Sequence, residues 1–299
     1  MNPGRQAGDW RVWLEAARPK TLPAAVIPVL VATALAAAHR SASLPKAAVC
    51  LGFALLVQIG TNFTNDYFDF VHGADNPRRV GPRRAVAAGL IAPERMRRAM
   101  AVVFAAAFLL GLLLVRDGGW WLLPVGVLSI ASGLAYTGGP FPLGYHGLGD
   151  AFVFIFFGLV AVGATFYVQT GWLAPEAITA GAALGLLAAN ILVANNYRDA
   201  ETDAAAGKRT LVVRFGKKFA VWQYALSTVI ALLAAPALTF AGYGWPVLLP
   251  LGLAPWAGVL TRRLAHSREP AEQIALLADT AKFLTAFGLL LGAGVWFGR

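Results

Sequence analysis

The stretch Asn65-Asp66-Tyr67-Phe68-Asp69 ends a long apolar run, and it recurs 130 residues later as Asn195-Asn196-Tyr197-Arg198-Asp199. The two stretches share Asn, Tyr and Asp at equivalent positions, and a basic segment follows each of them. Carboxylates at the edge of a membrane are costly and usually functional. The pattern predicts a duplicated acidic site in a membrane protein, which favours a divalent metal holding a phosphorylated ligand.

The composition indicates a polytopic membrane protein. Of the 299 residues, 58% are hydrophobic and only 13% are charged, whereas a soluble domain carries about 25% charged residues. The apolar runs are long and lack strict alternation, which excludes a β-barrel. We therefore expect an all-α fold in one domain spanning residues 1–299. Nine segments are long enough to cross a bilayer: 20–39, 46–65, 99–116, 120–137, 150–170, 175–196, 218–241, 245–262 and 273–297.

The basic residues predict the orientation in the membrane. Nine crossings place 20 of the 25 Lys and Arg residues on the side of the N-terminus and of the 66–98 and 197–217 loops. Because cytoplasmic loops are enriched in Lys and Arg, the N-terminus and both acidic stretches are expected to be cytoplasmic. This topology accounts for the net charge of +10 without a nucleic-acid partner. The single cysteine, Cys50, excludes an intrachain disulfide.

The two matching stretches also predict an internal repeat. Helices 1–4 would correspond to helices 5–8, with a ninth helix added. Two parallel halves bring the ends of their second helices together across a central cavity, which the two long cytoplasmic loops would cap.

The spacing of the acidic residues favours magnesium. Residues four apart lie on one face of a helix, and oxygen ligands without His or Cys suit Mg²⁺ rather than zinc or copper. The alternative is that these carboxylates are solvated and merely cap helix ends. The predicted metal ligands are Asn65, Asp66, Asp69, Asp75, Asn195, Asp199 and Asp203. The catalytic candidates are Asp66, Asp69, Asp199, Asp203 and Lys208.

Basic side chains follow both acidic stretches closely. Arg binds phosphate oxygens through two parallel hydrogen bonds, and Lys adds a point charge. The candidates for phosphate contact are Arg79, Arg84, Lys208 and Arg209. The preference of basic residues for the cytoplasmic side is the alternative explanation.

These residues match a family. The chain resembles the UbiA-type intramembrane prenyltransferases, whose hallmarks are an N-D-x-x-D array after helix 2 and a D-x-x-x-D array after helix 6. The usual third Asp of the first array is Gly73 here, and Asp75 comes two residues later. This departure resembles the 1,4-dihydroxy-2-naphthoate polyprenyltransferases of menaquinone biosynthesis. Three further stretches resemble that branch: 18–23 (RPKTLP), 136–145 (YTGGPFPLGY) and 207–211 (GKRTL).

The resemblance implies an enzyme of the bacterial plasma membrane. Mg²⁺ would bridge the two arrays and a polyprenyl diphosphate, an allylic cation would form, and the naphthoate ring would attack it and lose CO₂. Apolar and aromatic walls would shield the cation. The candidate walls are Phe63, Tyr67, Tyr136, Tyr145, Phe152, Phe156 and Tyr197, and their alternative role is ordinary packing.

Three further residues are candidates for contact with the acceptor. Arg18 and Lys20 could pair with the naphthoate carboxylate, or they could only anchor the first helix at the membrane surface. Asp150 could accept a proton from the acceptor or could cap the fifth helix. Asp279 and Lys282, three residues apart within the ninth span, are expected to pair with each other.

Two alternative functions remain open from the sequence. Another aromatic acceptor, such as 4-hydroxybenzoate or homogentisate, would keep the same chemistry. A cation-coupled transporter would also suit a repeat with membrane carboxylates, although both acidic arrays are expected on one side of the membrane rather than at its centre.

Overall fold

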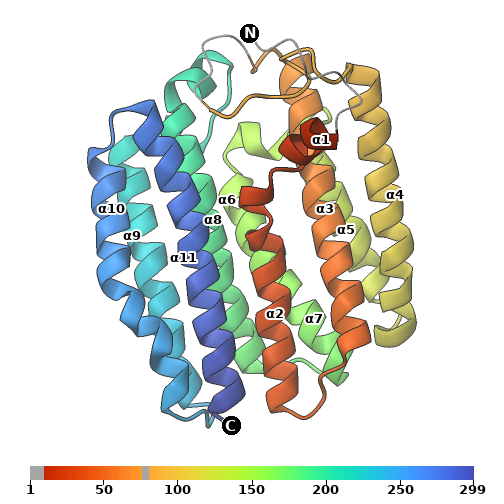
Figure 1. Ribbon diagram of the computed structural model, residues 1–299, viewed down its shortest axis with the longest axis vertical. Coiled ribbons are helices and arrows are strands. Elements are labelled where there is room, and N and C mark those ends of the chain that lie inside the picture. Colours follow the sequence, from red (N-terminus) through yellow and green to blue (C-terminus); the bar gives the residue numbers. More distant parts are fainter. Residues whose placement is uncertain (1–9, 76–80) are drawn as a thin grey trace.

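The computed structural model describes residues 10–75 and 81–299, and over these ranges the chain is helical throughout, without strands (Figure 1). The α-helices are α1 (Trp10–Ala17), α2 (Pro23–Ala38), α3 (Leu44–Val71), α4 (Pro93–Gly118), α5 (Leu122–Ala135), α6 (Gly149–Val153), α7 (Ala161–Thr170), α8 (Pro175–Ala205), α9 (Leu211–Thr239), α10 (Ala254–His266) and α11 (Pro270–Phe297). Three 3₁₀ segments, η1 (Pro19–Thr21), η2 (Leu143–His146) and η4 (Trp245–Leu253), and one π-helical segment, η3 (Phe154–Val160), complete the secondary structure.

The helices confirm an integral membrane protein. Within the described residues, six helical stretches have the length and hydropathy to cross a membrane: α3, α4, the continuous 149–170 stretch, α8, α9 and α11. A seventh is possible if α1–η1 and α2, which are bent by 55° to each other, are counted as one span. The segments α5 and α10 have only 14 and 13 residues. The expected nine crossings therefore stay a prediction.

Two helices run beyond their expected ends. The apolar runs predicted ends at residues 65 and 196, but α3 continues to Val71 and α8 to Ala205. The end of an apolar run marks where a helix leaves the hydrocarbon region of the membrane. The backbone can stay helical beyond that point as long as its polar side chains find partners. As a result, both acidic stretches lie on the last turns of helices and not in loops.

The end of α3 explains why a glycine occupies position 73. Gly73 has a positive φ of 70°, and the backbone N–H groups of Ala74 and Asp75 both donate to the carbonyl of Asp69. This left-handed residue terminates the helix without the steric cost that a Cβ atom would carry. The turn brings Asp75 back towards the carboxylates of α3.

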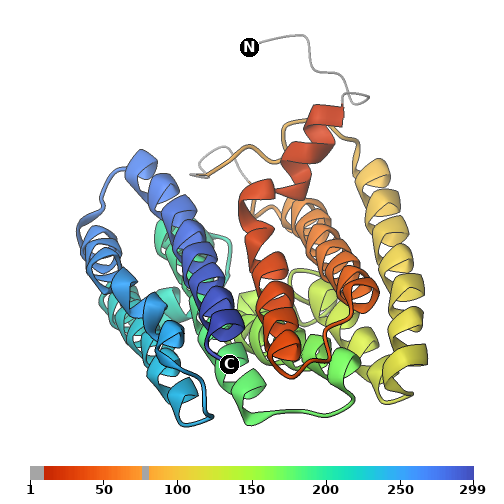
Figure 2. The same ribbon diagram turned by 60° about the horizontal axis from the view of Figure 1, so that its bottom comes forward.

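The helices pack as a bundle with α11 closing it. α11 contacts α2 and α8, while α3 packs on α4 and α8 on α9. Figures 1 and 2 show α1 and the loop before α4 at one end of the bundle and the C-terminus at the other. The large apolar core lies among α2, α8, α9 and α11. One end of the bundle is therefore where the polar ends of α3 and α8 can meet.

One helix crossing depends on glycine. A Cβ atom at Gly158 in η3 would lie 2.4 Å from the carbonyl oxygen of Gly181 and 2.6 Å from Cα of Gly185. Small residues let membrane helices approach until their backbones touch. This contact brings η3 against α8 and positions the aromatic residues next to Gly158.

Gly158→Ala is expected to destabilise the protein by about 1–3 kcal/mol, because the new methyl group meets backbone that cannot move aside. Gly163→Ala, also in the 149–170 span, is the control, because its Cβ would lie at an ordinary 3.5 Å from Leu173. The midpoint of thermal unfolding in detergent measures both. Equal midpoints for the two variants would contradict the close crossing.

Candidate active site

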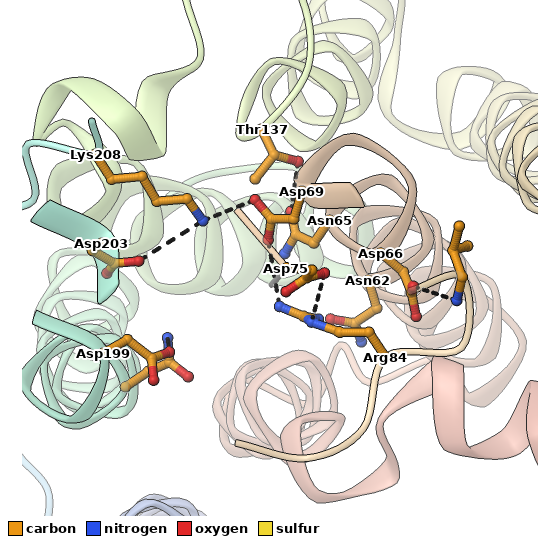
Figure 3. Close-up of polar contacts among 12 residues, drawn as sticks. Asn62, Asn65, Asp66, Asp69, Asp75, Arg84, Thr137, Asp199, Asp203 and Lys208 are labelled. Atoms are coloured by element: carbon orange, nitrogen blue, oxygen red, sulfur yellow. Dashed lines mark hydrogen bonds and ion pairs between the residues drawn. The ribbon is translucent and has the colours of Figure 1, made fainter. Parts of the chain in front are cut away.

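The acidic stretches of α3 and α8 line one cavity of about 460 Å³. Its walls contain all seven predicted metal ligands, together with Lys208, Arg84, Arg18, Lys20, Tyr136 and Tyr145. Figure 3 shows Asp69 on one side of this space and Asp199 and Asp203 on the other. The fold therefore brings together residues that lie 130 positions apart.

Asp69 accepts hydrogen bonds from three side chains in the cavity. Its Oδ1 accepts hydrogen bonds from Lys208 Nζ at 2.8 Å and from the Tyr145 hydroxyl at 3.1 Å. Its Oδ2 accepts from Arg84 Nη2 at 3.4 Å, and the whole residue is 3% exposed. Burial and the Asp69 carboxylate both raise the pKa of Tyr145, so this phenol stays protonated and donates.

Lys208 joins the two arrays (Figure 3). Its Nζ lies 2.8 Å from Asp69 Oδ1 and 3.9 Å from Asp203 Oδ1, and it also sits 4.7 Å from the centre of the Tyr145 ring. The backbone N–H of Lys208 donates to the carbonyl of Asp203, which ends α8 and turns the side chain inwards. A cation between two carboxylates marks the position where positive charge is favoured.

Asp199 pairs with its neighbour, which the sequence reasoning missed. Arg198 Nε and Nη2 lie 2.7 Å and 2.6 Å from the two Asp199 oxygens, and Nη2 also donates to Asn195 Oδ1 at 2.8 Å. Arg198 is 7% exposed. Its presence inside the acidic stretch of an apolar helix was the signal, since a buried Arg requires a partner.

Asp66 faces a loop. Its two carboxylate oxygens accept the backbone N–H groups of Ala85 and Val86, each at 3.0 Å, and the residue is 2% exposed. Asp66 therefore holds the 85–86 turn against the end of α3. Its predicted roles as a metal ligand and catalytic residue stay predictions.

Asp66→Ala is expected to lower stability by about 2–4 kcal/mol, because two buried N–H groups lose a charged acceptor. Asp66→Asn keeps one acceptor oxygen and is expected to cost less than half as much. Thermal unfolding in detergent ranks the two variants. An Asp66→Ala protein as stable as wild type would show that the turn does not depend on this carboxylate.

Asn62, one turn before Asn65, is a further residue that the sequence reasoning did not single out. Its side-chain Nδ2 donates to the backbone carbonyl of Ala17 at 2.9 Å, and its backbone carbonyl accepts from Arg18 Nη2 at 3.5 Å. Asn65 accepts from the Thr137 hydroxyl at 2.9 Å. The face of α3 that carries the acidic array thus also fixes the end of α1 and the segment after α5.

Arg84 contacts two of the predicted metal ligands, Asp69 on α3 and Asp75 beyond the end of that helix. Its Nη2 approaches Asp69 and its Nε lies 3.5 Å from Asp75 Oδ2. Lys20 lines the same cavity from η1. Arg79, a predicted phosphate contact, lies outside the described residues.

Several predicted wall residues lie elsewhere. Tyr67 packs against Phe68 within a cluster that contains Phe63, and Tyr197 lies in the main core with Lys217 over its ring. The Arg209 side chain is exposed and only its backbone meets Tyr145. None of these four side chains lines the cavity between the acidic stretches, and their expected contact with substrate stays a prediction.

Asp150 also differs from expectation. Leu148 is the N-cap of α6, without a side-chain cap, so the expected capping role is wrong. The Asp150 carboxylate instead accepts from Gln223 Nε2 of α9 at 2.9 Å. The expected pairing of Asp279 with Lys282, at 2.8 Å, is confirmed, and Arg263 joins it at 2.7 Å.

A second, apolar cavity of about 140 Å³ adjoins the first. Phe152 and Phe156 of the 149–170 span line it, together with Phe53 of α3. Gln58, Tyr136, Val153 and Phe157 line both cavities. The two spaces meet at these four residues.

The polar cavity suits magnesium bound together with a ligand. Among the described residues, no three Asp, Glu, His or Cys side chains are grouped closely enough to hold a metal by themselves. Mg²⁺ characteristically takes one or two carboxylates and completes its shell with water and substrate phosphates. Carboxylates on two walls, with Lys208 and Arg198 beside them, fit that requirement.

Residues 25–292 match the UbiA prenyltransferase family, and the chain belongs to this family. It is 37% identical, over 96% of its length and 97% of the relative's, to the 1,4-dihydroxy-2-naphthoate octaprenyltransferase of Mycobacterium tuberculosis. The protein of the same name from Escherichia coli is 35% identical over 99% of this chain and 98% of its own. The structure of a UbiA homolog from Archaeoglobus fulgidus bound to GPP and Mg²⁺ has a TM-score of 0.65 at 16% identity, covering 94% of this chain and 99% of that one.

Proposed function

We propose that the protein transfers a polyprenyl chain from polyprenyl diphosphate to 1,4-dihydroxy-2-naphthoate, with loss of CO₂, to give the demethylmenaquinol of menaquinone biosynthesis. The observation that carries the proposal is the single cavity in which Asp69 and Asp203 flank Lys208. Relatives named 1,4-dihydroxy-2-naphthoate octaprenyltransferase, at 32–37% identity, support the acceptor.

The polar cavity is the proposed site of the donor diphosphate. Asp69, Asp75, Asp199 and Asp203, with Asn65 and Asn195, would hold Mg²⁺ against its oxygens. Bound magnesium would neutralise the negative charge that gathers on the leaving diphosphate. Lys208, Arg84 and Arg198 would exchange part of their carboxylate contacts for phosphate oxygens, which they can bind in the same way.

The residues where the two cavities meet would surround the allylic carbon of the donor, which is the carbon that reacts. The donor C–O bond breaks and diphosphate leaves; the acceptor ring carbon then bonds to the allylic carbon, and the bond to the carboxyl carbon breaks as CO₂ departs. The aromatic face of Tyr136 stabilises the allylic cation. The apolar cavity of Phe53, Phe152 and Phe156 excludes water from it and would hold the first isoprene units.

The placement in the membrane is also proposed. Nine crossings with the N-terminus inside would put the polar cavity at the cytoplasmic face of a bacterial plasma membrane. This orientation is supported by the gathering of Lys and Arg in the loops at that end. Both substrates would then reach the cavity from the compartment and the leaflet on the cytoplasmic side.

Mass spectrometry of the product tests the function. Membranes containing the protein, supplied with 1,4-dihydroxy-2-naphthoate, a polyprenyl diphosphate and Mg²⁺, are expected to form demethylmenaquinol. EDTA should stop product formation, and restored Mg²⁺ should recover it. Prenylation of 4-hydroxybenzoate but not of the naphthoate would refute the proposed acceptor, and uptake of a solute without any prenylation would refute the enzyme.

A further inference from the structure

Gln58 of α3 occupies the junction of the two cavities. It precedes Asn65 by seven residues, which places it on the same face of the helix about 10 Å deeper in the membrane. It lines both the polar and the apolar cavity and is 8% exposed. A donor with its diphosphate in one cavity and its tail in the other would place its reacting carbon beside this side chain.

The amide of Gln58 is only half satisfied. Its Nε2 lies 3.5 Å from the Thr21 hydroxyl oxygen, and that hydroxyl itself donates to the carbonyl of Arg18. Thr21 can therefore only accept from Gln58, which fixes the amide with its nitrogen towards Thr21. The Oε1 atom is buried and has no hydrogen-bond partner among the described residues.

A buried acceptor of this kind requires a donor. Of the two substrates of the proposed reaction, the ionised diphosphate and the isoprenoid tail offer no hydrogen-bond donor. The ionised carboxylate of the acceptor offers none either. Of the groups on the two substrates, only the phenolic hydroxyls of the acceptor can donate a hydrogen bond at the junction.

Tyr136 also lines both cavities. A Cβ atom at Gly144 would lie 3.2 Å from the Tyr136 ring, and one at Gly149 would lie 3.0 Å from its hydroxyl. The lack of a side chain at Gly144 and at Gly149 therefore leaves the room that the Tyr136 ring occupies. A flat aromatic acceptor bound where the two cavities meet would lie beside both Tyr136 and Gln58.

We propose that Gln58 determines acceptor specificity by accepting a hydrogen bond from a ring hydroxyl of the naphthoate. The inference rests on the proposed function and adds the residue that recognises the hydroxyl. A site built to bind a hydroxyl discriminates strongly against analogues that lack it, because its own polar group is then left unpaired.

The test compares inhibitors that differ only in hydroxyl groups. Competitive inhibition constants against 1,4-dihydroxy-2-naphthoate are measured for 2-naphthoate, 1-hydroxy-2-naphthoate and 4-hydroxy-2-naphthoate. Wild-type protein is expected to bind one hydroxylated analogue about tenfold more tightly than 2-naphthoate. Gln58→Met, which keeps the length of the side chain without its acceptor, should reduce that ratio to about one. In the Gln58→Met protein, the KM for the naphthoate should rise, while the KM for the polyprenyl diphosphate should stay within twofold of the wild-type value.

Gln169→Met is the matched control. Gln169 is also a buried glutamine in a membrane helix, but its amide is satisfied by Ser43, Thr33 and Thr165, and it lines neither cavity. It should keep the wild-type inhibition ratio. Gln58→Leu serves as the second variant if Gln58→Met does not accumulate in membranes.

The outcomes separate this inference from the proposed function. Failure of wild-type protein to prenylate the naphthoate would overturn the proposed function. If wild-type protein prenylates the naphthoate but the inhibition ratio is unchanged in the Gln58 variant that accumulates in membranes, only the role of Gln58 is overturned. An equal rise in the KM values for donor and acceptor would also overturn it, because that result indicates a general distortion of the cavity.

Discussion

Asp69→Asn is expected to lower kcat by about a hundred- to a thousandfold while leaving the fold intact. The substitution is nearly isosteric, but it removes the negative charge that Lys208, Arg84 and Tyr145 all contact. A neutral amide holds Mg²⁺ more weakly than a carboxylate does, so the charge on the leaving diphosphate loses much of its stabilisation. The measurement is turnover at saturating Mg²⁺ and substrates, beside the thermal unfolding midpoint.

Asp117→Asn provides the control for this substitution. Asp117 is an exposed carboxylate at the end of α4 that lines neither cavity, so its replacement should leave kcat within twofold. Retention of more than a tenth of wild-type turnover by a folded Asp69→Asn protein would remove Asp69 from the metal site.

Asp199→Asn is expected to reduce both activity and stability. Turnover should fall by a similar hundred- to a thousandfold, because the second wall of the cavity loses its central carboxylate. In addition, the Arg198 side chain is only 2% exposed and would lose its bidentate partner. Breaking a buried ion pair by removing one member costs about 3–5 kcal/mol.

A second substitution separates these two effects. Asp199→Asn combined with Arg198→Gln removes the unpaired charge, so the unfolding midpoint should recover most of its loss while turnover stays low. Recovery of activity together with stability would mean that Asp199 acts only through Arg198 and not on a metal. The single change Arg198→Gln isolates the contribution of the guanidinium itself.

The helical membrane fold could be predicted because long apolar runs allow few other structures. The ends of α3 and α8 could not be predicted in the same way, since hydropathy reports where the membrane ends and not where the helix ends. Their extra turns place Asp69 and Asp199 on rigid helix instead of in loops. The break at Gly73 was visible only as a departure from the family pattern.

The angle of each residue around the helix axis separates the residues that face the cavity from those that face away from it. At about 100° per residue, Asn65 and Asp69 share a face, whereas Tyr67 lies about 200° from each of them. A helical wheel over the acidic stretch would therefore have turned Tyr67 away from the cavity, and the same holds for Tyr197 between Asn195 and Asp199. The contacts of Asp66 with the backbone of Ala85 and Val86, about twenty residues later, depend on tertiary structure that no local pattern encodes.

The most direct test is the binding of geranyl diphosphate, without acceptor, to purified protein in detergent, with and without Mg²⁺. Binding is expected to be at least about tenfold tighter with Mg²⁺. The Asp69→Asn protein and the Asp199→Asn/Arg198→Gln protein should each lose this gain, and combining the substitutions should cause little further loss, because both walls serve one metal–diphosphate complex. Magnesium-dependent binding that survives in both proteins, or losses that simply multiply in the combined protein, would contradict a shared site.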